Sequence, residues 1–579
     1  MSGADQHDME DLTMALSMEE ATAQLTRAGG MFSTDRIDIR GVTTTVWKAA
    51  PPTLRTVLDM TRAHGEKDYI VFEDERLTYA EHYRRAATLG QRLVAEFGIR
   101  KGDRVGLAMR NLPEWPLIFW ASVAVGAVIV PLNAWWTADE LEYGITDAGC
   151  RLLFVDAERL ETLEGKLPAL GLAATIVARP VGPLPEGVRE FTEVLGEVDS
   201  KATPPKVALQ PDDEATLFYT SGTTGRPKGA LGTHRNICQN LISAAFLRMR
   251  AALRAGNDPM AGMGGAGPSF LLSVPLFHVT GCHAILCGTT VAGGKLVMMY
   301  KWDAQRAIEL IERERITTFG GVPAMVWQVL EHPALAEHDL SSVTNVAYGG
   351  APAAPELVRR IQQAFPKVES SNGYGMTETS ALCTTNSGVD YLERPDSCGM
   401  PAPVTEVRIA GPNGQPLPAG EVGELMVKGP NVIKGYWNRP EADADTFRDG
   451  WLRTGDLARL DAEGYLYIVD RAKDMLIRGG ENIYCVEVED ALYSHPAVMD
   501  AAVIGIPHKV LGEEVGAIVQ IAPGQQSSED ELRAHVRERL AHFKVPVRIE
   551  LRDEPLPRNA NGKILKNQLK QEWALAPAG

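Results

Sequence analysis

Apolar, β-branched runs alternate with amphipathic stretches between about residues 50 and 350. This alternation is typical of parallel sheets covered by helices, so we expect an α/β body. One helix start is explicit in the sequence. Thr78 is followed three residues later by Glu81, a capping-box pattern, and Leu89 and Leu93 then fall on one helical face. The pattern predicts a scaffold helix directly after Thr78.

The stretch from Pro116 to Leu132 is uncharged and largely apolar. A membrane-spanning helix needs about 20 consecutive apolar residues, and this stretch is shorter and is interrupted by Gly126 and Pro131. Its second half is rich in β-branched residues. We therefore predict a buried helix that runs into a buried core strand, and no transmembrane segment.

The pattern changes twice towards the C-terminus. From Gly399 to Val469, short apolar runs separated by Gly and Pro turns predict a small β subdomain. After Asp470 the pattern is mixed and predicts a small α+β unit. Its expected elements are a helix at 486–494, a strand at 500–506 and a helix at 529–542.

The length of 579 residues exceeds what a single hydrophobic core supports, so at least two domains are expected. The fold class we predict is α/β, with a large body of stacked sheets and helices, a small β subdomain and a small α+β C-terminal domain. We divide the chain into a lead-in over 1–49, a body over 50–472 and a C-terminal domain over 473–579.

Composition narrows the class of protein. With 45% hydrophobic and 23% charged residues the chain resembles an ordinary soluble globular protein. The net charge of -17, without clustered Lys and Arg, argues against a nucleic-acid partner. The acidic N-terminal stretch lacks the basic and apolar regions of a secretory signal, so we expect a loosely ordered lead-in. Seven scattered cysteines without a C-x-x-C pair indicate reduced thiols and a cytoplasmic location.

The segment most informative about chemistry runs from Leu217 to Leu231, LFYTSGTTGRPKGAL. A Gly/Ser/Thr loop closed by a lysine can hold phosphates with backbone N–H groups, hydroxyls and one cation. It is not a Walker A loop, because Arg226 follows the second glycine and Lys228 comes before Gly229. From composition alone, a flexible surface turn explains the segment as well.

The string YTSGTTGRPKG at Tyr219 resembles the phosphate loop of adenylate-forming enzymes, the family of acyl-CoA synthetases, peptide-synthetase adenylation domains and firefly-type luciferases. Further motifs recur in family order over about residues 50 to 570. They are PLFHVTG at Pro275, YGGAP at Tyr348, NGYGMTET at Asn372, TGD at Thr454, DRAKDMLIRGGENI at Asp470 and PRNANGKILK at Pro557. We identify the chain as a member of this family, resembling fatty-acid–CoA ligases.

The resemblance implies ATP, Mg²⁺ and coenzyme A as cofactors and cosubstrates. It assigns the β- and γ-phosphates of ATP to Ser221, Thr223, Thr224 and Lys228. It assigns the α-phosphate to Thr377 and the metal to Glu378, whose carboxylate suits a hard cation. A solvated Thr-Glu helix cap is the plain alternative for this pair.

The resemblance also implies a nucleotide pocket. Tyr374 offers an aromatic face for adenine, with Asn372 near the amino group of the base. Asp456 can accept both ribose hydroxyls, and Arg471 is its partner in the family. The other wall of the adenine pocket is assigned to Gly350, Ala351 and Pro352.

Two half reactions follow from the resemblance. Lys563 is the lysine that bridges the substrate carboxylate and the α-phosphate during adenylation, where negative charge accumulates. The small C-terminal domain is expected to be mobile, turning about Lys473 so that the segment around Gly480 replaces Lys563 and lines the pantetheine tunnel. An unremarkable exposed lysine is the alternative for Lys563.

The acyl site is the least determined part. We interpret His278 as a neutral residue beside the acyl pocket rather than as an acid–base catalyst, although it stays a catalytic candidate. By position, six residues are expected to line the acyl pocket, the glycines giving it depth: Val279, Gly320, Gly321, Gly349, Gly375 and Met376. A medium- or long-chain fatty acid is the first expected substrate and an aryl acid the second.

Several alternatives stay open at this point. The acyl acceptor is either free coenzyme A or a separate carrier protein. A luciferase-like oxidation is a weaker enzymatic alternative, because one fold supports several chemistries. The non-enzymatic alternative is an acyl-nucleotide-binding sensor, which would be expected to lose Lys563 or Glu378, and both are present. A homodimer is compatible with the sequence, which does not determine the oligomeric state.

Overall fold

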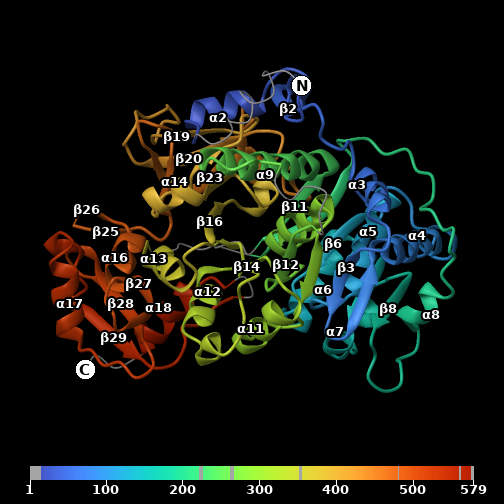
Figure 1. Cartoon of the computed structure of the whole chain (residues 1–579). Helices are drawn as coiled ribbons and strands as arrows, with labels where there is room; N and C mark the ends of the chain where they lie inside the picture. Colours follow the sequence, from blue (N-terminus) through green and yellow to red (C-terminus); the bar gives the residue numbers. More distant parts are fainter. Residues whose placement is uncertain are drawn as a thin grey trace, which may run out of the picture.

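The structure is a computed structural model of the whole chain and describes residues 15–220, 226–260, 267–350, 355–479, 481–559 and 562–575. Figure 1 shows a large body, blue through orange, with the red C-terminal domain beside it at the left. The described part of the chain is a mixed α/β protein, as the sequence predicts. Within these ranges no helix is both long and apolar enough to cross a membrane.

The first sheet of the body is mainly parallel. Its strands lie in the order β21 (Gly435–Tyr436), β11 (Lys228–Thr233), β10 (Glu214–Thr220), β6 (Val128–Leu132), β5 (Arg104–Ala108), β7 (Leu152–Asp156), β8 (Ala174–Ala178) and β9 (Val188–Glu190). Every residue of β6 and β7 is buried, which explains their uninterrupted apolar runs. The hairpin of β10 and β11 is antiparallel and closes at the pair Thr220 and Lys228. The Gly/Ser/Thr loop therefore connects two paired strands.

Three of the six other family motifs lie on or shortly after strands of the second sheet of the body. Its order is β18 (Met400–Pro401), β17 (Thr384–Ser387), β16 (Glu369–Tyr374), β15 (Asn345–Gly349), β14 (Thr318–Gly321), β12 (Ser269–Leu272), β13 (Lys295–Met298), β3 (Asp68–Phe72) and β4 (Glu75–Thr78). The strands from β16 to β3 in this order are parallel. Parallel strands end at the same edge of a sheet, so residues that follow β14, β15 and β16 meet there.

The predicted scaffold helix is confirmed. Helix α4 (Tyr79–Ala95) starts after Thr78, and both hydrogen bonds of the capping box with Glu81 are present. Leu89 and Leu93 are fully buried in the main core. The remaining helices of the body are α3 (Leu54–Met60), α6 (Ala138–Ala148), α7 (Ala157–Leu163), α8 (Phe191–Leu195), α9 (His234–Arg254), α10 (Gly288–Ala292), α11 (Ala304–Arg313), α12 (Pro323–Leu330), α13 (Pro355–Ala364), α14 (Gly388–Glu393) and α15 (Pro440–Thr446).

The uncharged stretch after Pro116 is a buried helix followed by a core strand, as predicted. Helix α5 (Glu114–Ala124) is buried at every position from Trp115 onwards, and β6 follows it. Gly126 makes the turn between them with φ +78°. Pro131 does not interrupt the strand, because it lies within β6 in register with Leu107 of β5.

Both predictions for the C-terminal half hold in outline. The β subdomain is a sheet of β19 (Glu406–Ala410), β20 (Gly423–Lys428), β23 (Trp451–Leu460) and β22 (Phe447–Arg448), with β24 (Leu466–Arg471) paired to β23. The C-terminal domain has the order β26 (Glu481–Ile483), β25 (Leu476–Arg478), β28 (Gly512–Ile521) and β27 (Val498–His508), with β29 (Arg548–Arg552) paired to β28. Its helices are α16 (Cys485–Tyr493), α17 (Glu529–Arg537) and α18 (Lys566–Leu575).

The helix predicted at 529–542 is too long. Helix α17 ends at Arg537, and a separate 3₁₀ turn follows at His542–Lys544. Leu532 and Val536 are the buried residues of α17, so the packed face ends with them. Without a packed face, the polar residues that follow gain little from continuing the helix.

The expectation of a loosely ordered lead-in is wrong for residues 15–49. This segment forms helix α2 (Met18–Leu25) and a hairpin of β1 (Thr34–Ile39) and β2 (Val42–Trp47). Trp47 is 1% exposed and packs against Phe32 and Phe246, and its indole N–H donates to Ser243 Oγ at 2.9 Å. The aromatic residues of the segment therefore anchor it to α9.

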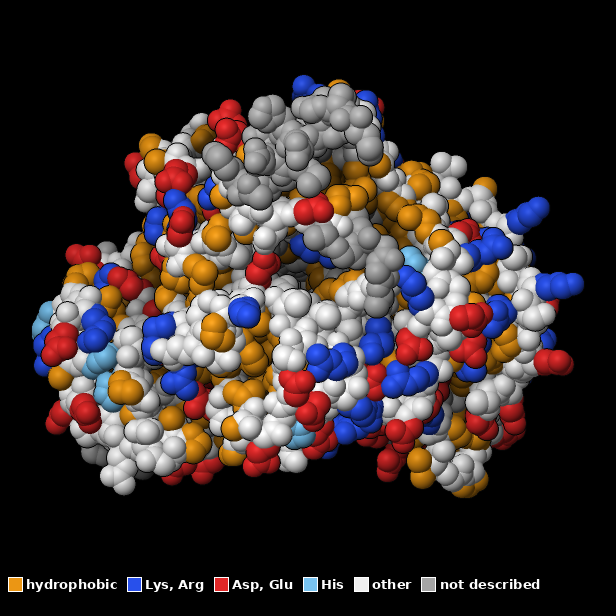
Figure 2. All heavy atoms as spheres, viewed as in Figure 1, with side chains coloured by type: hydrophobic (Ala, Val, Ile, Leu, Met, Phe, Trp, Pro, Cys, Tyr) orange, Lys and Arg blue, Asp and Glu red, His pale blue; other side chains and the backbone are white. Residues whose placement is uncertain are grey.

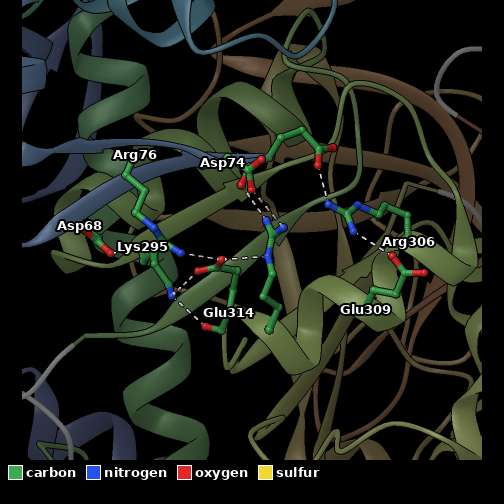
Figure 3. A network of polar contacts seen from close by, with 9 residues as sticks. Asp68, Asp74, Arg76, Lys295, Arg306, Glu309 and Glu314 are labelled. Atoms are coloured by element: carbon green, nitrogen blue, oxygen red, sulfur yellow. Dashed lines mark hydrogen bonds and ion pairs between the residues drawn. The ribbon is translucent and has the colours of Figure 1, made fainter.

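A network of ion pairs ties the edge of the second sheet to α11 (Figure 3). The side chain of Glu314 is only 2% exposed and lies 2.7 Å from Arg76, 3.1 Å from Arg313 and 3.2 Å from Lys295. Burial alone would raise the pKa of Glu314, but the hydrogen bonds from Arg76 and Lys295 lower it below its ordinary value. The network holds α11 against the edge of the second sheet. On the molecular surface, Figure 2 shows charges of both signs interspersed over the face viewed.

Candidate active site

A cavity of about 1450 Å³ lies between the body and the C-terminal domain. Residues from both parts line it, among them Tyr374 and Asp456 of the body and Lys563 of the C-terminal domain. The structure therefore brings together residues that are far apart in the sequence. The other predicted site residues that line the cavity are Gly350, Asn372, Gly375, Arg471 and Lys473.

Asp456 is the centre of a polar cluster in this cavity. It lies on β23, is 4% exposed, and its Oδ2 accepts from the Tyr374 hydroxyl at 2.6 Å. Its Oδ1 lies 3.1 Å from Nε of Arg471, its register partner on β24. Thr454 orients the turn, because its hydroxyl oxygen accepts from the Asp456 N–H at 3.1 Å. The carboxylate is held rigidly where it can accept hydroxyl groups.

Glu378 sits in the short 3₁₀ turn η6 (Thr377–Thr379), just after β16, and is 5% exposed. Its Oε1 accepts from the Tyr436 hydroxyl at 2.7 Å. Burial raises the pKa of Glu378, while the Tyr436 hydrogen bond and the charges of Arg471 and Lys563 oppose that rise. A buried carboxylate beside a cavity is a suitable cation ligand.

Asn240 of α9 holds the turn that follows Glu378. Its side-chain amide donates to the carbonyls of Thr379 and Ser380 at 2.9 and 3.0 Å. Ser380 has φ +57°, an uncommon conformation for a residue other than glycine. The amide hydrogen bonds stabilise it, so a long helix fixes the turn on which Glu378 sits.

Lys563 reaches the cavity from a tight turn. Its N–H donates to Asn559 Oδ1 at 3.0 Å, and its carbonyl accepts from the Asn559 N–H at 2.9 Å. Gly562 has φ +73°, and a Cβ there would lie 2.7 Å from Val322 of the body. Only glycine allows the turn to approach this closely.

The charge of Lys563 is tuned by its surroundings. Burial and the neighbouring cations Arg471 and Lys473 lower the pKa of Lys563 to about 8, whereas Asp456 and Glu378 act in the opposite direction. The ammonium group therefore lies within electrostatic reach of both carboxylates of the site. Burial also lowers the pKa of Lys473, which lies where the chain passes from β24 to β25.

The interpretation of His278 as a neutral residue beside the acyl pocket stays a prediction, and its surroundings favour the neutral form. Burial first, and then the charges of Lys563 and His283, lower its pKa to about 3. Its Nδ1 lies 3.1 Å from Thr280 Oγ1 and accepts from the Thr280 N–H at 3.3 Å. A neutral imidazole within electrostatic reach of Lys563 would contribute shape and polarity without charge.

Lys228 is the described member of the predicted phosphate loop. It starts β11, and its Nζ lies 5.1 Å from the ring centroid of Tyr436. The predictions for Ser221, Thr223, Thr224, Ala351, Pro352 and Gly480 lie outside the described residues.

The glycines assigned to the acyl pocket have another physical explanation. A Cβ at Gly320 would lie 1.6 Å from the Ala347 carbonyl oxygen, and one at Gly349 would lie 2.3 Å from that of Gly373. Both positions face the neighbouring strand, so glycine is required by backbone spacing in the sheet. Their role in the depth of the pocket stays a prediction, as do those of Val279, Gly321 and Met376.

The sequence analysis missed the apolar wall of the cavity. Helix α12 and the residue before it contribute Val322, Pro323, Ala324, Met325 and Trp327. This wall follows Gly321 directly in the sequence, GGVPAMVWQVL, and the turn that carries Lys563 packs on it. Phe277 and Trp302 line the same cavity. Lys563 thus lies where the apolar wall of α12 meets the polar cluster around Asp456.

Among the residues that the structure describes, no group of three or more His, Cys, Asp and Glu side chains is arranged to hold a metal ion. Mg²⁺ does not need such a group, because it is commonly bound through one or two carboxylates and the phosphates of a nucleotide. A single buried carboxylate at Glu378, within electrostatic reach of the cavity residues Arg471 and Lys563, fits that mode.

A two-domain α/β protein with these groups at its domain junction belongs to the class of adenylate-forming ligases. Two family models match the chain, the AMP-binding enzyme over residues 56–437 and the AMP-binding enzyme C-terminal domain over residues 487–563. The chain belongs to this family of AMP-forming acid–thiol ligases, the acyl-CoA synthetases.

Three similar proteins span almost the whole chain. A feruloyl-CoA synthase of Amycolatopsis is 39% identical over 86% of this chain and 94% of its own. A long-chain-fatty-acid–CoA ligase of Bacillus subtilis is 34% identical over 90% and 94%. The crystal structure of an anthranilate CoA ligase in complex with anthranoyl-AMP superposes with a TM-score of 0.82, at 28% identity over 91% and 98%. These relatives share the ligase activity and differ in the acid that names them.

Proposed function

We propose that this ligase joins an apolar monocarboxylic acid to coenzyme A, with a medium- or long-chain fatty acid as first substrate. The observation that carries the proposal is the apolar wall of α12, which begins beside the turn of Lys563. A carboxylate that pairs with Lys563 would leave its hydrocarbon part along Val322, Met325 and Trp327. Burying each CH₂ there contributes about 0.8 kcal/mol.

The residues of the chain have separate tasks in the first half reaction. The Lys563 ammonium group pairs with the substrate carboxylate. It stabilises the negative charge that accumulates when the carboxylate attacks the α-phosphate. Asp456 and Arg471 hold the nucleotide side, and Glu378 holds the cation. Bound Mg·ATP would supply its α-phosphorus as the electrophile. A carboxylate oxygen would bond to it while the bond to pyrophosphate breaks, and the acyl-AMP mixed anhydride formed carries AMP as the group that a thiolate can displace. No base is needed, because the acid is already ionised at neutral pH.

An aryl acid is the second candidate. Trp302, Trp327 and Phe277 line the cavity, and aromatic side chains suit an aromatic substrate. The relative named feruloyl-CoA synthase and the structural neighbour that holds anthranoyl-AMP support this alternative.

The test is a pyrophosphate-release assay over a panel of saturated acids, hydroxycinnamates and benzoates, with and without coenzyme A. We expect the highest specificity constant for a saturated acid of about eight or more carbons, because a chain of that length is needed to follow the α12 wall. We expect thioester to form only when coenzyme A is present. A preference for hydroxycinnamates would favour the aryl alternative. Adenylate formation without thioester would point to a carrier protein, and binding without turnover to a sensor.

A further inference from the structure

Tyr436 lies between two predicted ATP-binding groups, and the proposed function assigns it no task. It is on β21, which pairs with β11 so that Tyr436 is the register partner of Ala230. Lys228 stands at the start of the same strand β11. The short strand β21 therefore places an aromatic residue at the edge of the sheet, next to the predicted phosphate loop.

The hydroxyl group of Tyr436 points at Glu378. It donates to Oε1 of the carboxylate at 2.7 Å, across 58 residues of sequence. Each carboxylate oxygen can accept two hydrogen bonds or bind a cation. The bond from Tyr436 uses one lone pair of Oε1 and does not involve Oε2. This hydrogen bond restricts the rotation of the Glu378 carboxylate.

The backbone on both sides of Tyr436 is held firmly. The Ile433 N–H donates to the Glu378 carbonyl at 3.0 Å, and the Tyr436 N–H donates to Asp443 Oδ1 at 2.7 Å. The Trp437 N–H donates to the Gly229 carbonyl at 2.8 Å. The segment is thus tied both to the turn of Glu378 and to the strand of Lys228.

The ring of Tyr436 meets the second group. The Lys228 ammonium lies 5.1 Å from the ring centroid, within the range of cation–π attraction. One side chain therefore contacts the predicted metal ligand through its hydroxyl and the predicted phosphate lysine through its ring.

We propose that Tyr436 is a positioning residue that sets the geometry of the cation site through Glu378 and of the phosphate lysine through its ring. The proposal rests on the proposed use of Mg·ATP. Residues that only orient a metal ligand by hydrogen bonding commonly contribute 10- to 100-fold to metal affinity. The hydroxyl and the ring make separable contributions, because the hydroxyl contacts the predicted metal ligand Glu378 and the ring contacts the predicted phosphate lysine Lys228.

The test compares Tyr436→Phe, which keeps the ring, with Tyr436→Leu, which removes both groups. Binding of α,β-methylene-ATP, which cannot react, is measured by titration calorimetry with Mg²⁺ and with EDTA. We expect Tyr436→Phe to weaken binding about 10-fold or more in Mg²⁺ and to leave it unchanged in EDTA. Tyr436→Leu should weaken binding under both conditions. In the adenylation assay, Tyr436→Phe should need at least about 10-fold more Mg²⁺ for half-maximal rate.

Two controls make the result specific. Tyr83→Phe removes another hydroxyl–carboxylate hydrogen bond, the one to Asp59 at 3.0 Å in the N-terminal part of the body, and should change neither affinity nor Mg²⁺ requirement. Glu378→Gln combined with Tyr436→Phe should bind no more weakly in Mg²⁺ than Glu378→Gln alone, because the hydroxyl acts through that carboxylate.

The proposal is overturned if Tyr436→Phe behaves like Tyr83→Phe, or if its loss is equal in Mg²⁺ and EDTA. It is also overturned if the two losses add independently in the double variant. If the proposed function fails because the protein does not use Mg·ATP, wild-type protein itself shows no binding of the analogue. If it fails only in the acid or the acceptor, the pyrophosphate-release panel shows this and the binding comparison is unaffected. Melting curves identify any variant that does not fold.

Discussion

Arg471 and Asp456 face each other as register partners on β24 and β23, with Nε of the guanidinium 3.1 Å from Oδ1 of the carboxylate. Asp456 also accepts from the Tyr374 hydroxyl at 2.6 Å. Both residues belong to the β subdomain and line the cavity between the body and the C-terminal domain. A carboxylate held from two sides is oriented before any ligand arrives, which reduces the entropic cost of binding.

Asp456→Asn should weaken AMP binding by about 1.5–3 kcal/mol, or about 10- to 150-fold, because a hydrogen bond to a charged acceptor is lost. Titration calorimetry with AMP measures the loss. Asp461→Asn is the matched control, since Asp461 accepts from the Tyr467 hydroxyl at 3.1 Å within the same β subdomain. Equal AMP affinity of wild type and Asp456→Asn would remove Asp456 from the nucleotide site.

Glu378→Gln should lower the rate of adenylate formation by about 100-fold or more, beyond what loss of a merely supporting residue causes. The side chain keeps its size and its contact with Tyr436, so the free energy of unfolding should change by no more than about 1 kcal/mol. The measurement pairs a pyrophosphate-release assay over a range of Mg²⁺ concentrations with denaturant unfolding. Normal activity at every Mg²⁺ concentration would exclude Glu378 as the ligand.

The lowered pKa of Lys563, about 8, predicts a pH dependence. The charged ammonium form is lost as the pH rises through that value, so kcat/KM for adenylation should decline above about pH 8, whereas an ordinary lysine titrates above 10. Since kcat/KM reports the free enzyme, the charges of bound ATP do not mask the shift. Lys563→Arg, if active, should lose this decline because arginine stays charged. A wild-type profile that is flat to pH 10 would contradict the account.

Glu314 offers a test of the structural network. Glu314→Gln removes one carboxylate from three cations and should lower the free energy of unfolding by about 2 kcal/mol, less than for a fully enclosed pair since Arg76 is half exposed. The pKa of Glu314 is lowered in the folded state, so its contribution is present at neutral pH and is lost as the pH falls through that lowered value. Glu309→Gln, in the same network at the surface of α11, should cost about 0.5 kcal/mol or less. Equal effects of both variants would contradict the central role of Glu314.

Local patterns predicted local structure well. The capping box at Thr78 and the apolar run before Leu132 each depend on neighbours in sequence, and both elements form as predicted. The end of α17 was missed because it depends on where the packed face stops rather than on helix propensity. Residues 15–49 were misjudged because two of their aromatic contacts form only with Phe246 of α9, which lies about 200 residues further along the chain.

The motifs predicted which polar residues meet at the cavity but not its apolar wall. Lys563, Asp456 and Tyr374 meet at one cavity, as the family resemblance implies. Tyr436 was missed because its partner Glu378 is 58 residues away and the two meet only in the folded chain, where the Ile433 N–H also donates to the Glu378 carbonyl. Gly349 was predicted to give the acyl pocket its depth. A side chain at this position would collide with the backbone of Gly373 on the neighbouring strand, and this constraint can be recognised only when the strand order is known.

The central claim is that Lys563 serves adenylation alone. The most direct test measures the two half reactions of Lys563→Ala separately: pyrophosphate release from acid and ATP, and thioester formation from chemically prepared acyl-AMP and coenzyme A. The account predicts that the first falls by at least about 100-fold, since charge stabilisation at the reacting atoms contributes about 3 kcal/mol or more, while the second stays within about twofold of wild type. An equal loss in both half reactions would contradict it.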